Sequence, residues 1–214
     1  MINHKHKFIY VRVTKTASHS LLRALFESEM TEDDKWIPRE TKTWDFPEAD
    51  IEIKFLTDVS SVWDQDKKHY PLSIVKKVTS DSVYNSYFKF AFVRNPFDKL
   101  VSAYAYTLNW YLENDPSSPY CPREFKEWVQ NLDVNDKYGF QHTYVDGCDF
   151  VGRFENLQLD FNKICDKIKI PHQQLPHKNS SKHRHYTEYY DEETKQIVAE
   201  KYAKDIEMFG YEFG

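Results

Sequence analysis

The sequence has few cysteines and no long apolar segment. It contains three cysteines in 214 residues, Cys121, Cys148 and Cys165, and no C-x-x-C pair. An odd number of cysteines argues against a complete disulfide framework, so a reducing compartment is the simpler expectation. No apolar run reaches the roughly 18 residues that a membrane span needs, and the first residues, MINHKHKF, contain no apolar signal region. We therefore expect neither a transmembrane segment nor a signal peptide.

The sequence also lacks an excess of positive charge. The net charge is −5, from 29 Lys and Arg against 34 Asp and Glu. This balance gives no support for non-specific nucleic-acid binding, so any basic surface must be local. Aromatic residues make up 16% of the chain, which favours an ordered globular fold. The length is that of one domain, and we expect residues 1–214 to form it.

The phosphate-binding pattern G-x-x-x-x-G-K-[ST] is absent, but residues 8–26 have a related order. An apolar run from Phe8 to Val13 predicts a strand, and the spacing of Leu21, Leu25 and Phe26 predicts a helix. The turn between them contains Lys15, small residues and hydroxyls. Such a turn presents backbone N–H groups and the positive end of the helix dipole. We therefore interpret it as a site for an anion.

A second strand-turn-helix segment begins at residue 88. Phe88 to Val93 is a compact apolar strand, Asn95 is a suitable N-cap, and Pro96 falls at the first helical position. Arg94 lies at the end of the strand, and Ser102 lies two turns into the helix. Arginine suits a phosphate because its rigid fork donates two hydrogen bonds at once. This segment is therefore a second candidate anion site.

Strands and helices alternate through the rest of the chain. Spacing and turn residues predict a short strand at 51–56, helices at 72–78, from 96 to about 112, at 123–132, 157–168 and 192–209, a strand at 149–154, a polar link at 79–86, and loops at 113–122, 135–147 and 171–186. This order predicts an α/β, P-loop-like three-layer fold with a central, mainly parallel sheet flanked by helices. Ligands of such sheets bind at the carboxyl ends of the strands, where both anion turns lie.

Both segments resemble sulfotransferases that use 3′-phosphoadenosine 5′-phosphosulfate (PAPS). The Lys15 turn is similar to their 5′-phosphosulfate loop, and residues 93–104 resemble their 3′-phosphate element, VRNPFxxLVSAY. The similarity is to the carbohydrate sulfotransferases of the Golgi-type, second family and to their bacterial and viral relatives. It continues at residues 150–157, 175–179, 189–191, 205–207 and 209–211. Golgi relatives carry an N-terminal membrane anchor, which we do not expect here, so we expect a cytoplasmic protein, or a Golgi-lumenal one if the chain is part of a longer protein.

The resemblance implies transfer of a sulfuryl group from PAPS to an acceptor hydroxyl, without a metal. Lys15 would hold the 5′-phosphate and stabilise the leaving oxygen, while Arg94 and Ser102 would hold the 3′-phosphate. His19 stands where the family usually has threonine, which leaves the contacts of the 5′-phosphate open. The remaining donor-binding residues that the resemblance implies are Thr16, Ala17, Ser18, His19 and Ser20 in the turn, and Lys182 and Arg184 in a loop over the nucleotide.

The acceptor hydroxyl needs a general base, and imidazole titrates near neutral pH. His69 is the first candidate because relatives have a histidine ahead of the 3′-phosphate strand, and His142, after Gln141, is the second. His19 is a third. The plainer interpretation of His69 is an ordinary turn histidine. The histidines between 172 and 185 match no zinc spacing, so we expect no metal site.

Other plain interpretations stay open. Lys15 can be a solvated turn lysine, Arg94 can pair with Asp98, and Glu155 and Asp205 suit structural roles. Trp44, Phe46 and Phe55 can stack on a sugar or pack in the core. The alternatives to a carbohydrate sulfotransferase are a non-catalytic nucleotide- or glycan-binding module on the same fold and a P-loop-like kinase. The sequence fixes neither the acceptor nor the oligomeric state.

Overall fold

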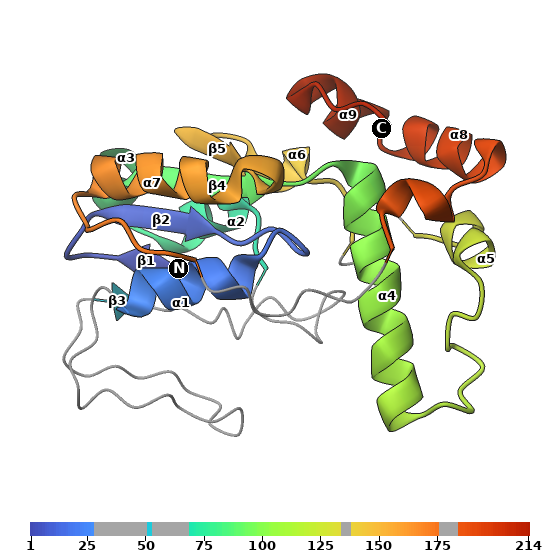
Figure 1. Ribbon diagram of the computed structural model, residues 1–214. Helices are drawn as coiled ribbons and strands as arrows, with labels where there is room; N and C mark the ends of the chain where they lie inside the picture. Colours follow the sequence, from blue (N-terminus) through green and yellow to red (C-terminus); the bar gives the residue numbers. More distant parts are fainter. Residues whose placement is uncertain (28–50, 53–68, 134–137, 176–183) are drawn as a thin grey trace.

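The structure is a computed structural model that describes residues 1–27, 51–52, 69–133, 138–175 and 184–214 (Figure 1). Most of the expected strand at 51–56, the aromatic residues Trp44, Phe46 and Phe55, and Lys182 lie outside these residues. Within the described ranges, no helix is both long and apolar enough to cross a membrane. The strands are β1 (Ile2–Asn3), β2 (Phe8–Val11), β3 (Ile51–Glu52), β4 (Phe88–Val93) and β5 (Phe150–Arg153).

The five strands form one sheet in the order β3-β1-β2-β4-β5. β2 pairs with β4 and β4 with β5 in parallel, while the short β1 runs antiparallel to both of its neighbours. In the central pair, Phe8 lies opposite Phe88 and Val11 opposite Ala91. Because these strands are parallel, the Lys15 turn and Arg94 both follow strand ends at the same edge of the sheet.

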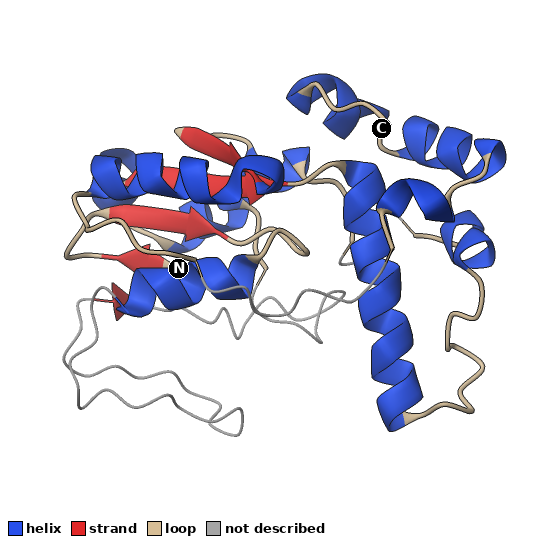
Figure 2. Cartoon of the chain, viewed as in Figure 1, coloured by secondary structure: helices blue, strands red, loops and turns tan. Residues whose placement is uncertain are grey.

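Helices cover both faces of the sheet, as Figure 2 shows. Phe8, Tyr10, Phe90 and Phe92 form one core with α1 (Ser18–Glu27) and α7 (Leu157–Ile168). The alternate strand residues form a second core with α2 (Leu72–Val78), α3 (Asp81–Ser86) and α6 (His142–Val145) on the opposite face. Successive side chains of a strand point to opposite faces, so apolar strands of this kind fit a sheet buried on both sides. The prediction of a mainly parallel three-layer α/β fold is confirmed.

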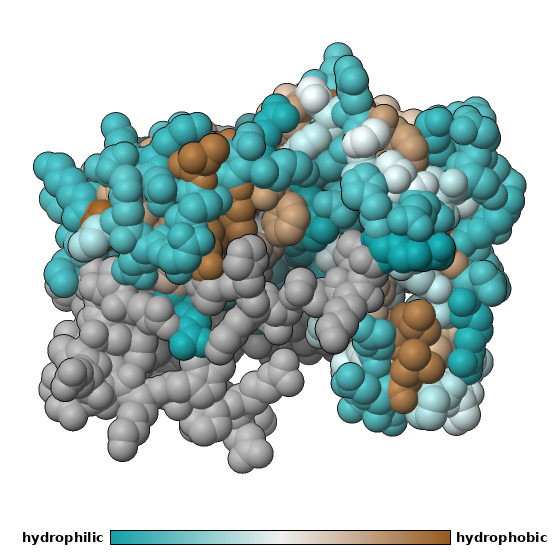
Figure 3. Space-filling view, viewed as in Figure 1, coloured by the Kyte–Doolittle hydropathy of each residue, from teal (hydrophilic) through white to brown (hydrophobic). Residues whose placement is uncertain are grey.

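A group of helices stands beside the carboxyl edge of the sheet. It consists of α4 (Pro96–Asn114), α5 (Phe125–Gln130), α8 (Glu192–Lys201), α9 (Ala203–Phe209) and the short 3₁₀ turns η1 (Phe154–Asn156) and η2 (Tyr186–Tyr189). Asn95 caps α4, accepting the N–H of Phe97 at 3.1 Å. The first half of α4 is buried, whereas its outer half extends away from the sheet (Figure 1) and leaves apolar atoms at the surface (Figure 3).

Two expectations about secondary structure were wrong. The link at 79–86 contains α3, because Ser80 accepts the N–H of Val83 at 3.3 Å and caps a short polar helix. The segment 135–147, expected to be mostly loop, contains the four-residue helix α6. The last helix divides into α8 and α9 at Tyr202, which is fully buried and donates its hydroxyl to the carbonyl of Tyr138 at 3.0 Å. Each outcome depends on a local cap or a tertiary contact that apolar spacing does not reveal.

Candidate active site

The Lys15 turn has an unusual backbone. Lys15 has a φ of 63° and Ala17 a φ of 59°, both in the left-handed region. Such a conformation costs a residue with a Cβ about 1–2 kcal/mol, and observed strain of this kind clusters at functional sites. Turns of this type aim successive N–H groups into a concavity that binds anions. The turn also opens directly onto α1, which begins at Ser18.

The side chains of the turn differ in their surroundings. Thr16 is fully buried, and its hydroxyl donates to the carbonyl of Val13 at 3.0 Å, so this side chain fastens the turn. Ser18 and Ser20 are buried as well, whereas His19 is exposed at the first turn of α1. The N–H groups of a first helical turn have no carbonyl of their own helix to bond. The turn therefore offers backbone donors, with Lys15 beside them.

Arg94 connects the two candidate anion sites. Its Nη1 donates to the carbonyl oxygen of Lys15 at 3.2 Å, although 79 residues separate them in sequence. Its Nε pairs with Asp98 at 2.7 Å, and the guanidinium lies 4.0 Å from the ring centre of Phe154. The expected pairing of Arg94 with Asp98 is thus present. The hydrogen bond to Lys15 uses Nη1 and the ion pair with Asp98 uses Nε, so neither of them involves Nη2. Ser102 is buried on the same helix as Asp98.

The side chain of Gln141 holds the backbone of Arg94 in place. In the sequence, the only indication of Gln141 was its position in a segment that resembles the family. Its Oε1 accepts the N–H of Arg94 at 2.9 Å, and its Nε2 donates to the carbonyl of Arg94 at 2.8 Å. Gln141 is fully buried. The amide thus bonds the end of β4 as a neighbouring strand would. Glu155 fixes the next residue, accepting the N–H of Asn95 at 2.7 Å and the hydroxyl of Tyr211 at 3.1 Å.

His142 is oriented by a buried carboxylate. Asp205 accepts the N–H of Gln141 at 2.8 Å and that of His142 at 2.9 Å, and its Oδ1 lies 2.6 Å from Nδ1 of His142. Asp205 is fully buried. With the proton on Nδ1 donated to the carboxylate, the lone pair of the neutral ring lies on Nε2. Asp205 therefore has the structural role expected of it and also sets the orientation of a candidate base.

His69 lies beside the Lys15 turn. Its Nδ1 is 2.9 Å from the carbonyl oxygen of Arg12, which can only accept. Nδ1 must therefore carry the proton, and the lone pair of the neutral ring lies on Nε2. Arg12 in turn donates from Nη2 to Ser18 at 3.4 Å. His69 and His142 thus both have the tautomer that a general base acting through Nε2 requires.

Two lysines of the site region have tertiary partners that no sequence pattern indicated. Nζ of Lys15 lies 4.3 Å from the ring centre of Tyr106, a cation–π distance. Lys99 is buried and donates to the carbonyls of Tyr138 and Gly139 at 3.1 and 2.7 Å. Burial lowers the pKa of Lys99 from 10.5 to about 8, and the nearby charge of Asp205 opposes this shift.

The remaining expected site residue, Arg184, is exposed. Its Nη1 lies 3.5 Å from Glu188, and its guanidinium lies 5.3 Å from the ring centre of Tyr189. These partners belong to its own segment, so the expected contact of Arg184 with a nucleotide stays a prediction. All three cysteines are free thiols, and burial raises the pKa of Cys165 to about 11. In the part of the chain that the structure describes, no three His, Cys, Asp or Glu side chains are grouped as metal ligands would be.

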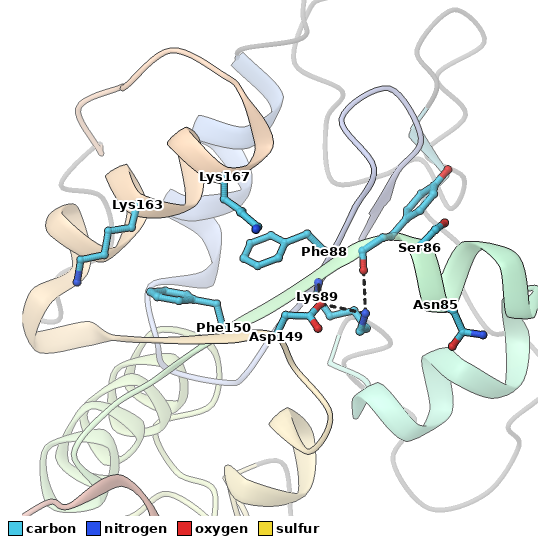
Figure 4. A pocket seen from close by; sticks show the side chains of 9 residues that line it. Asn85, Ser86, Phe88, Lys89, Asp149, Phe150, Lys163 and Lys167 are labelled. Atoms are coloured by element: carbon cyan, nitrogen blue, oxygen red, sulfur yellow. Dashed lines mark hydrogen bonds and ion pairs between the residues drawn. The ribbon is translucent and has the colours of Figure 1, made fainter.

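A separate hollow of about 570 Å³ lies at the opposite edge of the sheet, around the first residues of β4 and β5 (Figure 4). There Nζ of Lys89 donates to the carbonyls of Tyr84 and Tyr87 and pairs with Asp149 at 2.9 Å. The ammonium group of Lys89 is therefore already neutralised by Asp149 and hydrogen-bonded to two carbonyls. The hollow is therefore distinct from the Lys15–Arg94 site, which lies beyond the other end of β4.

Comparisons with known proteins agree with this geometry. The sequence profile of the sulfotransferase family, in its second group, matches residues 1–212. An uncharacterized protein of Archaeoglobus fulgidus is 31% identical over 107 residues, which are 47% of this chain and 83% of that protein. The family profile spans both strand-turn-helix segments and the helices beside them. The resemblance noted in the sequence is confirmed, and the chain belongs to the second sulfotransferase family.

Proposed function

We propose that the protein transfers a sulfuryl group from PAPS to a hydroxyl of a carbohydrate acceptor. The observation that carries the proposal is the hydrogen bond from Nη1 of Arg94 to the carbonyl of Lys15. It joins two anion-binding turns at the carboxyl edge of one parallel sheet, where ligands of such sheets bind. A donor with phosphates at both its 5′ and 3′ positions needs two such turns at a fixed separation.

The residues fit this donor. The left-handed backbone at Lys15 and Ala17 and the N-terminus of α1 suit the 5′-phosphate. Arg94, Ser102 and the N-terminus of the 19-residue helix α4 suit the 3′-phosphate. A kinase would also need an anion-binding loop for its phosphates, so the comparison of ligands described below separates the two functions.

In the transfer step, the acceptor oxygen forms a bond to sulfur while the bond from sulfur to the 5′-phosphate oxygen breaks. The acceptor proton passes to a histidine, and adenosine 3′,5′-bisphosphate leaves with the negative charge. Catalysis of such transfers depends mainly on positioning and electrostatic stabilisation. Lys15 would stabilise the charge on the leaving oxygen, because it belongs to the turn that holds the 5′-phosphate.

His69 is the first candidate for the base, since its bond to Arg12 places it against the Lys15 turn. His142 is the second, supported by the 2.6 Å contact with Asp205. Loss of a general base lowers kcat by about 10²–10⁴-fold and should leave donor affinity intact. Comparing His69→Ala with His142→Ala assigns the role, and His172→Ala is the matched control because His172 is an exposed histidine paired with a carboxylate.

The donor half is tested by titrating adenosine 3′,5′-bisphosphate while following thermal unfolding, against ADP and ATP–Mg²⁺. A ligand at about 100 times its Kd adds roughly 2.7 kcal/mol of stability. We expect selective stabilisation by the bisphosphate, lost in Lys15→Ala and Arg94→Ala but kept in the exposed-site controls Lys163→Ala and Arg123→Ala. Stabilisation by ATP–Mg²⁺ alone would favour a kinase. Bisphosphate binding without release of bisphosphate from PAPS, with any hydroxyl-bearing acceptor, would favour a non-catalytic module.

A further inference from the structure

The outer half of α4 exposes two aromatic rings one helical turn apart. Tyr106 is 47% exposed and Trp110 is 49% exposed. Residues four apart lie on the same side of a helix, so the two rings are neighbours on one face. Large aromatic side chains usually bury most of their surface, and two exposed rings side by side indicate a binding surface.

This face begins at the proposed site of sulfuryl transfer. Nζ of Lys15 lies 4.3 Å from the ring centre of Tyr106, and Ser102 lies one turn before Tyr106 on the same helix. Each step of four residues advances about 6 Å along the axis. Ser102, Tyr106 and Trp110 therefore mark a track that leads from the donor phosphates, past Lys15, to the outer end of α4. The spacing of the steps is on the scale of one sugar ring.

The polar side chains around the rings indicate the kind of ligand. Asn109 and Glu113 are exposed and lie three residues after Tyr106 and Trp110, so an amide and a carboxylate flank the rings. Between the buried Lys99 and Arg123 the sequence contains no Lys or Arg, but it contains Glu113 and Asp115. A polyanionic glycan needs cationic partners along its length, and beyond Lys15 at the inner end of the track this stretch of sequence provides none. Hydroxyl groups of a neutral glycan can bond to the amide and the carboxylate.

We propose that Tyr106 and Trp110 form the acceptor subsite and that the acceptor is an uncharged glycan whose sugar rings pack on them. The apolar C–H face of a sugar ring would pack on the exposed part of each aromatic ring, and burial of this surface drives the contact. Tyr106 holds the sugar beside Lys15, and Trp110 holds the next sugar outward. The inference rests on the proposed function, because it needs the sulfuryl group to be delivered next to Lys15.

The test uses the full chain saturated with adenosine 3′,5′-bisphosphate. Maltohexaose and N-acetylated chitotetraose are the neutral probes, and unsulfated heparosan and chondroitin oligosaccharides are the anionic probes. Binding is measured by saturation-transfer NMR and by titration calorimetry. The variants are Trp110→Ala, Trp110→Phe, which keeps a ring, and Leu112→Ala. Leu112 is also 49% exposed but lies two residues away, on another side of the helix, and is the matched control.

We expect a neutral probe to bind and Trp110→Ala to raise its Kd about tenfold or more, which is at least 1.4 kcal/mol. The Kd of Trp110→Phe should stay within a few-fold of the wild-type value, and the Kd of Leu112→Ala should equal the wild-type value. Bisphosphate affinity should be the same in all four proteins. The inference is overturned if the bisphosphate-bound protein binds none of the neutral probes, prefers the anionic ones, or binds equally well after Trp110→Ala. In each of these cases the donor half of the proposed function stands, whereas loss of bisphosphate binding in the wild type overturns the proposed function itself.

Discussion

Replacing Gln141 with methionine tests how the backbone of Arg94 is held at the carboxyl end of β4. Methionine has a similar length and fills the same space, so the change removes polar partners without opening a large cavity. In the wild type, the Gln141 amide accepts the N–H of Arg94 at 2.9 Å and donates to its carbonyl at 2.8 Å. After the substitution, both backbone groups lose these partners in a buried position.

The expected loss of stability follows from those two bonds. A buried donor or acceptor left unsatisfied costs about 1–3 kcal/mol, so the pair should cost about 3–4 kcal/mol. For a chain of this size, 1 kcal/mol lowers Tm by about 2–4 °C, which gives a decrease on the order of 10 °C. Because the same bonds position Arg94, affinity for adenosine 3′,5′-bisphosphate should fall as well.

The assay is urea unfolding followed by tryptophan fluorescence, together with a titration of the bisphosphate. Gln130→Met is the matched control, since Gln130 is exposed and its amide bonds Glu193 at 2.7 Å on the surface. That variant should stay within about 0.5 kcal/mol of wild type. If Gln141→Met is no less stable than Gln130→Met, the assignment of Gln141 as the partner of the Arg94 backbone is wrong.

Three further predictions concern other parts of the fold. In Gly152→Ala the new Cβ would lie 2.6 Å from the ring of Phe92, and such overpacking should cost about 1–3 kcal/mol in chemical unfolding; an unchanged midpoint would contradict it. Ser80→Ala removes the cap that Val83 donates to and should cost about 1 kcal/mol, with loss of protection of the amides of α3 in hydrogen exchange. Burial lowers the pKa of Lys99 to about 8, so its charged form opposes folding below that pH and this penalty is relieved as pH rises toward 10.5. Wild type should therefore gain stability relative to Lys99→Met by about 1.4 kcal/mol per pH unit at most above pH 8, and parallel pH profiles would refute the burial of a charged amine.

Some structural elements were specified locally, and their bounds were predicted closely. The helices at 72–78 and 157–168 and the strand at 88–93 occur at the predicted residues. Their apolar residues recur at the period of the element, and Asn95 with Pro96 marks the start of α4 through backbone chemistry alone. The break at Tyr202 was not predictable in this way, because it depends on a carbonyl at Tyr138 that lies far away in sequence.

The candidate site shows the same division. Lys15 and Arg94 were proposed as anion-binding residues from residue types and their position after strands, together with the resemblance to a family to which the profile match assigns the chain. The parallel register of β2 and β4 then brings the two turns together, as expected for strands whose carboxyl ends share an edge. Their direct contact, from Nη1 of Arg94 to the carbonyl of Lys15, had no sequence signal.

The sequence by itself determined the family, most of the strands and helices, and the positions of the two candidate anion turns, because these depend on periodicity, caps and residue chemistry within short segments. Only the tertiary structure decided that Gln141 completes the hydrogen bonds of Arg94, that Asp205 orients His142, and that Tyr106 lies under Lys15. The physical reason is distance along the chain. A hydrogen bond or a ring contact acts over a few ångströms in space, and residues separated by tens of positions reach that range only after the core has packed.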